Sequence, residues 1–148
     1  KLHMIGGLQT NKVKYVIKLF DYIHSLDSLR LAEKISIEQK KINKSLKIFI
    51  QVNIGEEDQK LGIEIKDLEN FYEICVKKLD LDIIGLMCLP PKNKDNTEYF
   101  SKMKYLASKI GVKQLSMGMS ADYIQASNLG STFIRVGSNI FGERFKKS

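Results

Sequence analysis

The sequence has no long apolar run, few cysteines and few arginines, and each shortage argues against a class of protein. None of its apolar runs approaches the ~18 residues that suggest a membrane-spanning helix. The N-terminus also lacks the charged and then apolar pattern of a signal peptide. It begins instead with residues 1–6, which have the character of a strand, so we expect that sequence upstream of Lys1 is missing.

Cysteine occurs only twice, as Cys75 and Cys88. The separation of the two residues matches neither metal-ligand spacing nor the CxxC pattern, and nothing else in the sequence indicates a metal site. We therefore predict two free thiols in a cytoplasmic protein, although the sequence alone leaves a disulfide open.

Positive charge is plentiful, but arginine is scarce. The formal net charge is +7, and arginine is found only at Arg30, Arg135 and Arg144. The lysines are spread along the whole chain, whereas nucleic-acid binders usually concentrate basic residues in a patch or stripe. We interpret the lysines as the solvated faces of helices, and we expect no nucleic-acid partner and no membrane partner.

Short apolar runs alternate with longer amphipathic segments from one end of the sequence to the other. With 148 residues, of which 43% are hydrophobic, the chain has the size of one domain with a buried core. The pattern predicts an α/β fold. We expect strands over residues 2–6, 22–25, 47–53, 83–88, 114–117 and 132–136, and helices over 11–20, 28–43, 65–78, 96–110 and 121–129.

Six strands that each form a nearly continuous apolar run favour a parallel sheet covered by helices. Two layouts remain open at this point, a doubly wound open sheet and a (β/α) barrel. In both layouts, functional groups gather beyond the carboxyl ends of the strands. Gly111 and Gly130 suit the left-handed position just past a helix end. Asn53, at the end of a strand, either faces a pocket or closes a turn.

The strongest functional signal lies at the ends of the fifth and sixth predicted strands. Ser120 comes just before the helix expected near Ala121, and Gly137 and Ser138 follow the sixth strand. Glycine lets the backbone approach an anion, and serine adds a hydroxyl donor. Singly, Ser120 is explained as an N-cap and Gly137 as a tight turn. Together they predict a phosphate-bearing cofactor, because barrels often bind phosphate at this place.

Arg135 interrupts an otherwise apolar run, residues 133–136. A buried charge without a partner is costly, so this arginine needs an acceptor in the protein or in a ligand. Alternation along the strand places Arg135 opposite Ile134 and Val136, on the face that would line the interior of a barrel. An ion pair with an internal carboxylate is the structural alternative. Glu143 and Arg144 are expected to form a local surface pair.

Two motifs, Ser116-Met117-Gly118-Met119-Ser120 and Ile140-Phe141-Gly142-Glu143-Arg144, stand beside shorter matches in residues 3–12, 24–28, 51–54 and 85–87. Together these segments resemble the pyridoxal phosphate homeostasis proteins over essentially the whole chain. The resemblance implies a (β/α)8 TIM-type barrel of the alanine racemase N-terminal domain type. A complete barrel of this kind has about 250 residues. The six strands are therefore expected to be an incomplete barrel, with residues 1–148 forming the C-terminal two thirds of a single domain.

The resemblance also implies a cofactor, pyridoxal 5′-phosphate, which such proteins store and deliver rather than use for turnover. The cofactor-binding residues that it implies are Arg135, Ser120, Gly137, Ser138, Met119 and His3. The serines and the glycine would hold the phosphate, Arg135 would approach the pyridine nitrogen, and the other two would line the pocket. By its residue type alone, a lone histidine in a strand is more often structural. An arginine beside the pyridine nitrogen keeps that atom unprotonated and weakens the ring as an electron sink.

In the family, the lysine that forms the Schiff base with the cofactor lies at the end of the first barrel strand. That strand corresponds to sequence upstream of Lys1, so the covalent half of the site is expected to be absent from residues 1–148. Lys47 and Lys113 are poor substitutes, because they stand at the entry ends of their strands, opposite the active face.

Other functions remain open at this stage. A racemase or decarboxylase would need a general base opposite the lysine, commonly tyrosine or cysteine, and Cys88 is the only internal thiol at a strand end. A basic RNA-associated protein would bind with a steep dependence on salt. For a carrier, the expected partners are the cofactor and the apo-enzymes that receive it. An incomplete barrel has unpaired edges, which predict self-association or closure by an N-terminal segment.

Overall fold

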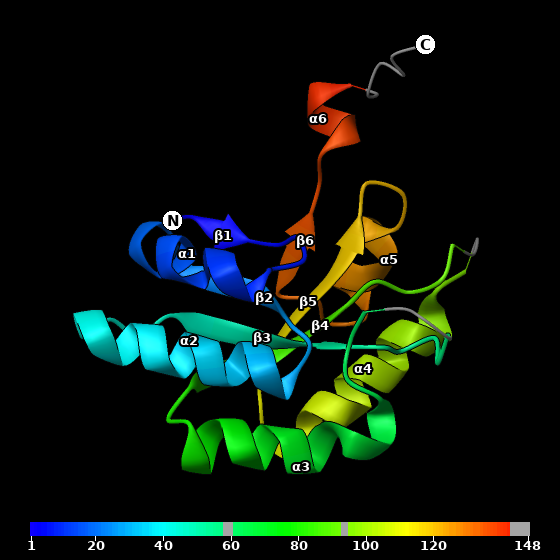
Figure 1. Ribbon diagram of the computed structural model, residues 1–148. Coiled ribbons are helices and arrows are strands. Elements are labelled where there is room, and N and C mark those ends of the chain that lie inside the picture. The colour runs from blue at the N-terminus through cyan, green and yellow to red at the C-terminus, as the bar shows by residue number, and fades with distance from the viewer. Residues whose placement is uncertain (58–60, 93–94, 143–148) are drawn as a thin grey trace.

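The computed structural model describes residues 1–57, 61–92 and 95–142. Its centre is a six-stranded sheet in which every pairing is parallel and the strands follow in sequence order (Figure 1). The strands are β1 (His3–Met4), β2 (Tyr22–Leu26), β3 (Lys47–Val52), β4 (Asp82–Cys88), β5 (Gln114–Met119) and β6 (Phe133–Arg135). A doubly wound sheet reverses its strand order at a switch point. The uninterrupted order shows that the fold is an incomplete (β/α) barrel.

Helices lie around the outside of this sheet, whereas the last helix stands away from it (Figure 1). They are α1 (Val13–Leu19), α2 (Leu29–Ile42), α3 (Leu68–Glu73), α4 (Thr97–Ile110), α5 (Tyr123–Asn128) and α6 (Ser138–Phe141). Short 3-10 turns at Thr10–Lys12 and Ile65–Asp67 precede α1 and α3, and a π-helical stretch, Ile74–Lys78, continues α3. The sequence did not predict α6. No helix in the described ranges is long and apolar enough to cross a bilayer.

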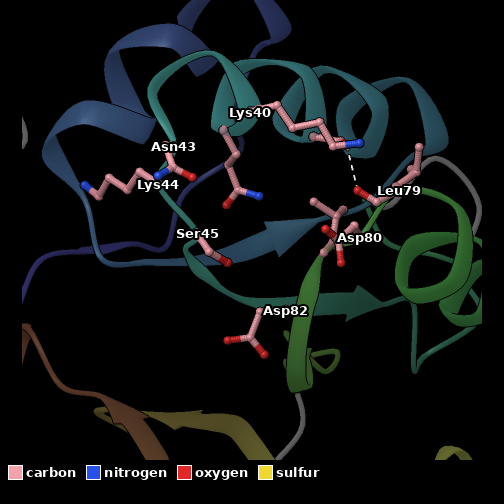
Figure 2. A pocket seen from close by; sticks show the side chains of 10 residues that line it. Lys40, Asn43, Lys44, Ser45, Leu79, Asp80 and Asp82 are labelled. Atoms are coloured by element: carbon pink, nitrogen blue, oxygen red, sulfur yellow. Dashed lines mark hydrogen bonds between the residues drawn. The ribbon is translucent and has the colours of Figure 1, made fainter.

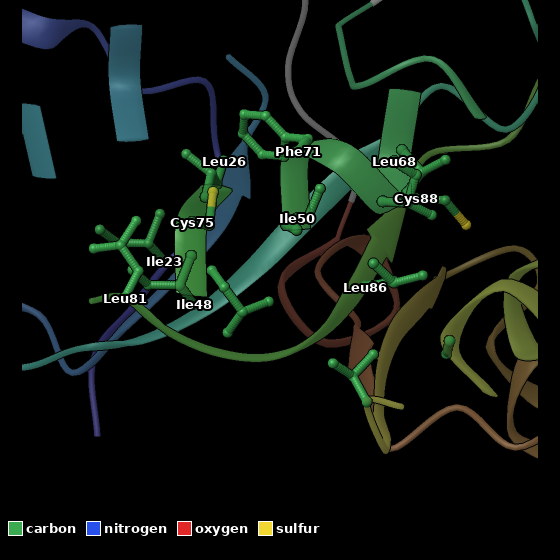
Figure 3. Close-up of a cluster of buried hydrophobic side chains, with 14 of the residues drawn as sticks. Ile23, Leu26, Ile48, Ile50, Leu68, Phe71, Cys75, Leu81, Leu86 and Cys88 are labelled. Carbon is green, nitrogen blue, oxygen red and sulfur yellow. The ribbon is translucent and has the colours of Figure 1, made fainter. Parts of the chain in front are cut away.

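The main hydrophobic core fills the space between the sheet and the helices (Figure 3). Side chains alternate along a strand, so every second residue of β2 and β3 faces the helices, as Ile23, Ile48 and Ile50 do. Leu68 and Phe71 of α3 pack against this layer. Burying each large apolar side chain stabilises the fold by about 1.5–3 kcal/mol, which holds the strand ends in fixed positions.

Aromatic side chains occupy the opposite, inner face, and their contacts show that the sheet is curved. The ring centroid of Phe133 on β6 lies 5.8 Å from that of His3 and 5.3 Å from that of Phe49 on β3. In a flat sheet β6 would lie three strand spacings, about 14 Å, from β3. The curvature brings the inner faces of β1, β2, β3 and β6 around one interior, as a barrel requires.

The turn residues identified in the sequence behave as their chemistry requires. Gly111 and Gly130 have φ angles of +79° and +98°, the left-handed conformation expected just past a helix end. The side-chain amide of Asn53 donates to the carbonyl oxygen of Glu57 (2.9 Å), and its oxygen accepts from the Glu57 N–H (3.3 Å). Asn53 therefore closes a turn.

Both cysteines are free and buried, which confirms the prediction of two thiols. Figure 3 shows Cys75 and Cys88 within the apolar cluster. Burial raises the pKa of each thiol to about 12. Because the thiolate is the reactive form, we expect a disulfide reagent to label the folded chain more than about 100-fold more slowly than the unfolded chain. Absorbance of the released thiolate checks this, and rapid labelling of either cysteine in the folded state would contradict it.

Candidate functional site

A hollow of about 450 Å³ opens beyond the carboxyl ends of β5 and β6. This volume lies within the range of ~300–1,000 Å³ that is typical of small-molecule sites. The residues that line it are Met119, Ser120, Ala121, Arg135, Gly137, Ser138 and Asn139. The structure thus brings together five of the six residues that the sequence suggested. The sixth, His3, is not among the lining residues.

Two hydrogen bonds tie the loop after β5 to the loop after β6. The Gly137 N–H donates to Ser120 Oγ (3.1 Å), and the side-chain amide of Asn139 donates to the carbonyl oxygen of Ser120 (3.0 Å). Because the Ser120 oxygen accepts here, its own hydrogen remains available to a ligand. The N–H groups of Ser138 and Asn139 have no acceptor within the described residues. These donors form a fixed edge that is suited to an anion.

The sequence-based assignment of Ser120 to the start of the following helix was wrong. The helix α5 begins at Tyr123, and the residue before it is Asp122. One carboxylate oxygen of Asp122 accepts from the Met119 N–H (2.7 Å), and the other accepts from the side-chain amide of Asn96 (2.8 Å). These bonds hold residues 119–122 in a turn, so Ser120 faces the loop after β6 instead of capping α5.

Two glycines shape the hollow in different ways. At Gly118 the φ angle is +93°, and an added Cβ would lie 2.6 Å from the Cβ of Ala126, so only glycine lets α5 pack this closely on β5. At Gly137 an added Cβ would meet no atom of the described residues within 4 Å. Packing of these residues therefore leaves the space at Gly137 open, and a ligand can approach the backbone there.

Arg135 is fixed by two uncharged acceptors on different strands. Its Nη1 donates to Ser116 Oγ (2.7 Å), and its Nη2 donates to the carbonyl oxygen of Cys88 (2.8 Å). A guanidinium group has five N–H donors, of which these bonds use two, and the other three bond to none of the described residues. Burial lowers the pKa of Arg135 below its usual range, yet an arginine stays charged at neutral pH. No carboxylate in the described ranges forms an ion pair with it, so the ion-pair alternative is wrong for this part of the chain.

His24 and Ser116 also belong to this site, although the sequence analysis did not single them out. His24 is only 2% exposed; its Nδ1 lies 2.8 Å from Ser116 Oγ and its Nε2 lies 3.0 Å from His3 Nδ1. Burial, aided by the charges of His3 and Arg135, lowers the pKa of His24 to about 4. His24 is therefore neutral at physiological pH. The available signal was a polar residue inside a largely apolar strand, which is the kind of signal that identified Arg135.

His3 lies on the inner face, stacked on Tyr22 with a centroid distance of 4.1 Å and an interplanar angle of 6°. Burial lowers the pKa of His3. His3 thus contacts His24 and the aromatic cluster, and it reaches Arg135 only through intervening side chains.

A second hollow, of about 350 Å³, lies at the other end of the strands (Figure 2). Lys40, Asn43 and Lys44 line it at the end of α2, and Asp80 and Asp82 line it at the start of β4. Its buried polar groups are already occupied: Ser36 Oγ donates to the Leu79 carbonyl (2.6 Å), and Gln39 accepts from the Leu46 N–H (2.7 Å). In barrels this end of the strands serves stability, and these bonds fit that role.

Cys88 is poorly suited to be a general base. It is fully buried at the end of β4, and burial raises the pKa of its thiol to about 12. Such a thiol stays protonated near neutral pH, which removes the residue on which the racemase or decarboxylase interpretation depended.

No group of three or more His, Cys, Asp or Glu side chains in the described part of the chain is placed to hold a metal ion. The predicted pair of Glu143 and Arg144 lies outside the described residues.

The incomplete barrel and its strand-end hollow agree with comparisons to known proteins. The chain belongs to the alanine racemase N-terminal domain family, whose profile matches residues 1–145. Alanine racemase of Clostridium difficile shares this fold, with a TM-score of 0.73, 16% identity and coverage of 99% of this chain and 41% of the racemase.

Within this family, the chain is similar to proteins named pyridoxal phosphate homeostasis protein. The one from Aquifex aeolicus is 38% identical over 96% of this chain and 66% of its own length, and the one from Escherichia coli K12 is 32% identical over 96% and 64%. The chain thus spans just under two thirds of these relatives. PipY of Synechococcus elongatus, whose structure was solved with pyridoxal phosphate bound, has a TM-score of 0.86 and 31% identity over 95% of this chain and 69% of PipY.

Proposed function

We propose that the protein binds pyridoxal 5′-phosphate and takes part in its storage and delivery in the cytoplasm, without turning over a substrate. The observation that carries this proposal is the hollow beyond β5 and β6, where five predicted residues meet around free N–H and O–H donors. The pyridoxal phosphate bound to PipY and the names of the relatives support the same ligand.

The proposal assigns a task to each part of the hollow. Ser120, Gly137 and Ser138 would hold the phosphate, because their donors stand on the edge where two loops are tied together. Arg135 would face the pyridine nitrogen with its remaining N–H groups, and Met119 would cover the ring. Bound pyridoxal phosphate supplies an aldehyde and an electron-withdrawing ring. A charged arginine at the nitrogen keeps that atom unprotonated, which favours binding over demanding amino-acid chemistry.

We also propose that these residues are part of one barrel domain and that its covalent lysine lies on a strand upstream of Lys1. Lys47 is the first residue of β3, and Lys113 precedes β5. Both stand at the end of the sheet opposite the hollow, so neither supports a covalent bond at this site.

Mixing the 148-residue chain with pyridoxal 5′-phosphate is therefore expected to give reversible binding without a covalent link. Borohydride treatment followed by mass spectrometry should find no stoichiometric adduct, and a single fully modified strand-end lysine would contradict the proposal.

Ser120→Ala should weaken binding about 10- to 100-fold, because it removes a hydrogen bond to a charged group. Ser101→Ala is the matched control, since Ser101 is an exposed residue of α4. Equal affinities of the two variants would refute the assigned phosphate cradle.

Delivery implies partners, and we propose that they are apo-enzymes dependent on the same cofactor.

The exposed edges of the sheet further support self-association of this chain. Ile140 and Phe141 of α6 are 67% and 85% exposed, and Leu2 beside β1 is 56% exposed. Light scattering after gel filtration should give a mass above that of one chain. A monomer at every concentration would contradict self-association.

A further inference from the structure

A continuous chain of hydrogen bonds crosses the inner face of the barrel and ends at Arg135. It links His3 on β1 to His24 on β2, then Ser116 on β5, and then Arg135 on β6, with distances of 3.0, 2.8 and 2.7 Å between successive polar atoms. His24 and Ser116 are 2% and 0% exposed, so water does not compete for these bonds. Four strands thus contribute one polar side chain each to a single connected group.

The donor and acceptor capacity of Ser116 determines which atom donates and which accepts in each of these hydrogen bonds. Its oxygen accepts from Arg135, which has only donors, and its own hydrogen has one acceptor within reach among the described residues, the Nδ1 of His24. If His24 carried a proton on Nδ1, the Ser116 hydrogen would be buried without a partner, at a cost of about 1–3 kcal/mol. His24 therefore carries its proton on Nε2 and donates it to the Nδ1 of His3. The same reasoning places the proton of His3 on Nε2.

We propose that Ser116, with His24 and His3 behind it, forms a tautomer-locked chain of positioning residues that aims Arg135 at the cofactor ring. The orientation of Arg135 toward the ring, called the aim below, rests on the function proposed above. The fixed tautomers of the two histidines, called the lock below, depend only on residues of this protein. Two acceptors on different strands, Ser116 Oγ and the Cys88 carbonyl, fix the plane of the guanidinium group. The histidines keep the serine oxygen turned toward the arginine.

Ser116, His24 and His3 are uncharged, so they leave the charge of Arg135 available to a ligand. Asp122 is the carboxylate whose charge acts on Arg135, and both of its oxygens already accept other hydrogen bonds. The charged or titratable groups that act on His24 are His3 from β1 and Arg135 from β6, and both oppose its protonation. A pyridine nitrogen that met Arg135 would thus face a positive charge that no carboxylate of the described residues pairs with directly.

The lock is tested first in the ligand-free protein by nitrogen NMR. At neutral pH, both histidines are expected to be protonated on Nε2 alone, and the Nη signals of Arg135 are expected to be resolved because rotation of the group is restricted. Ser116→Ala should merge the Nη signals and release the tautomer of His24, whereas Ser116→Thr, which keeps the hydroxyl, should preserve both signatures. The matched control is Ser25→Ala, because the Ser25 hydroxyl, on the same strand as His24, is buried and has no hydrogen-bond partner among the described residues. A protonated Nδ1 on His24, or unchanged Arg135 signals in Ser116→Ala, would overturn the proposal.

The aim is tested with pyridoxine 5′-phosphate, which has the ring and the phosphate but no aldehyde. Its ultraviolet absorbance reports protonation of the ring nitrogen in the bound state. In Ser116→Ala the ratio of protonated to unprotonated ring at a given pH is expected to rise about tenfold, equivalent to one unit of pKa, with rescue in Ser116→Thr. An unchanged ring titration in a variant that still binds would overturn the aim. Failure of the wild-type chain to bind the probe would refute the proposed function, and the NMR result would still decide the lock.

Discussion

Replacing Gly85 by alanine is expected to lower the free energy of unfolding by more than about 3 kcal/mol. An added Cβ at this position would overlap the carbonyl oxygen of Gln114 on the neighbouring strand and lie 2.7 Å from its carbonyl carbon. These are backbone atoms, so a side-chain rotation does not relieve the contact. Gly85 pairs with Gln114 in the β4–β5 ladder, and the substitution would therefore separate two central strands.

The effect should reach the functional site, because the same ladder pairs Met87 with Ser116. The Cys88 carbonyl and the Ser116 hydroxyl both bind Arg135, so parting β4 from β5 would remove its two fixed acceptors at once. Urea denaturation followed by circular dichroism measures the loss. Gly6→Ala is the control, since a Cβ at Gly6 meets no atom within 4 Å in the part of the chain that the structure describes, and its effect should stay within about 0.5 kcal/mol. Similar stabilities for both variants would refute this account of β4 and β5.

Acidification from pH 6.5 to pH 4 is expected to cost about 3 kcal/mol of stability through His24 alone. The pKa of this histidine falls from 6.5 to about 4 in the folded chain, chiefly because of its burial. Below pH 6.5 the unfolded chain takes up a proton that the folded chain excludes, so the unfolded state gains stability as the pH falls. Each pKa unit corresponds to about 1.4 kcal/mol. The penalty stops growing below pH 4, where His24 is protonated in both states.

The comparison with His24→Asn isolates this contribution from the carboxylates that also titrate in acid. Asparagine retains a polar group near the position of Nδ1 but does not titrate, so the variant should lose less stability between pH 6.5 and pH 4 than the wild type. Urea unfolding at several pH values provides both slopes. Parallel slopes would show that His24 is exposed or already charged in the folded chain. They would also undermine the neutral hydrogen-bonded chain behind Arg135.

The sequence predicted the six strands well because each one is an apolar run with turn residues beside it. Periodicity also placed Arg135 on the inner side of its strand, where it lies in the structure. The choice between a doubly wound sheet and a barrel required the strand order, which is set by pairings between residues far apart in the chain. Local patterns contain no information about these pairings. Only the resemblance to a family favoured the barrel.

The position of Ser120 and the extent of α5 show where local rules fail. A serine before an amphipathic segment predicted a helix start, but Asp122 binds the Met119 N–H and delays the helix to Tyr123. The helix α6 went unpredicted because it has four residues and no buried face. In both places short-range hydrogen bonds decide the conformation, and they leave no periodic trace in the sequence.

The sequence by itself determined the α/β fold class, the inward-facing arginine and the serine and glycine residues beyond the last two strands. Those features follow from alternation and from residue chemistry, which act over a few neighbouring positions. Only the tertiary structure decided what Arg135 contacts. Ser116 and the Cys88 carbonyl lie 19 and 47 positions away from it in the chain. Curvature of the sheet brings them together, because parallel strands that close toward a barrel turn their inner side chains onto one another.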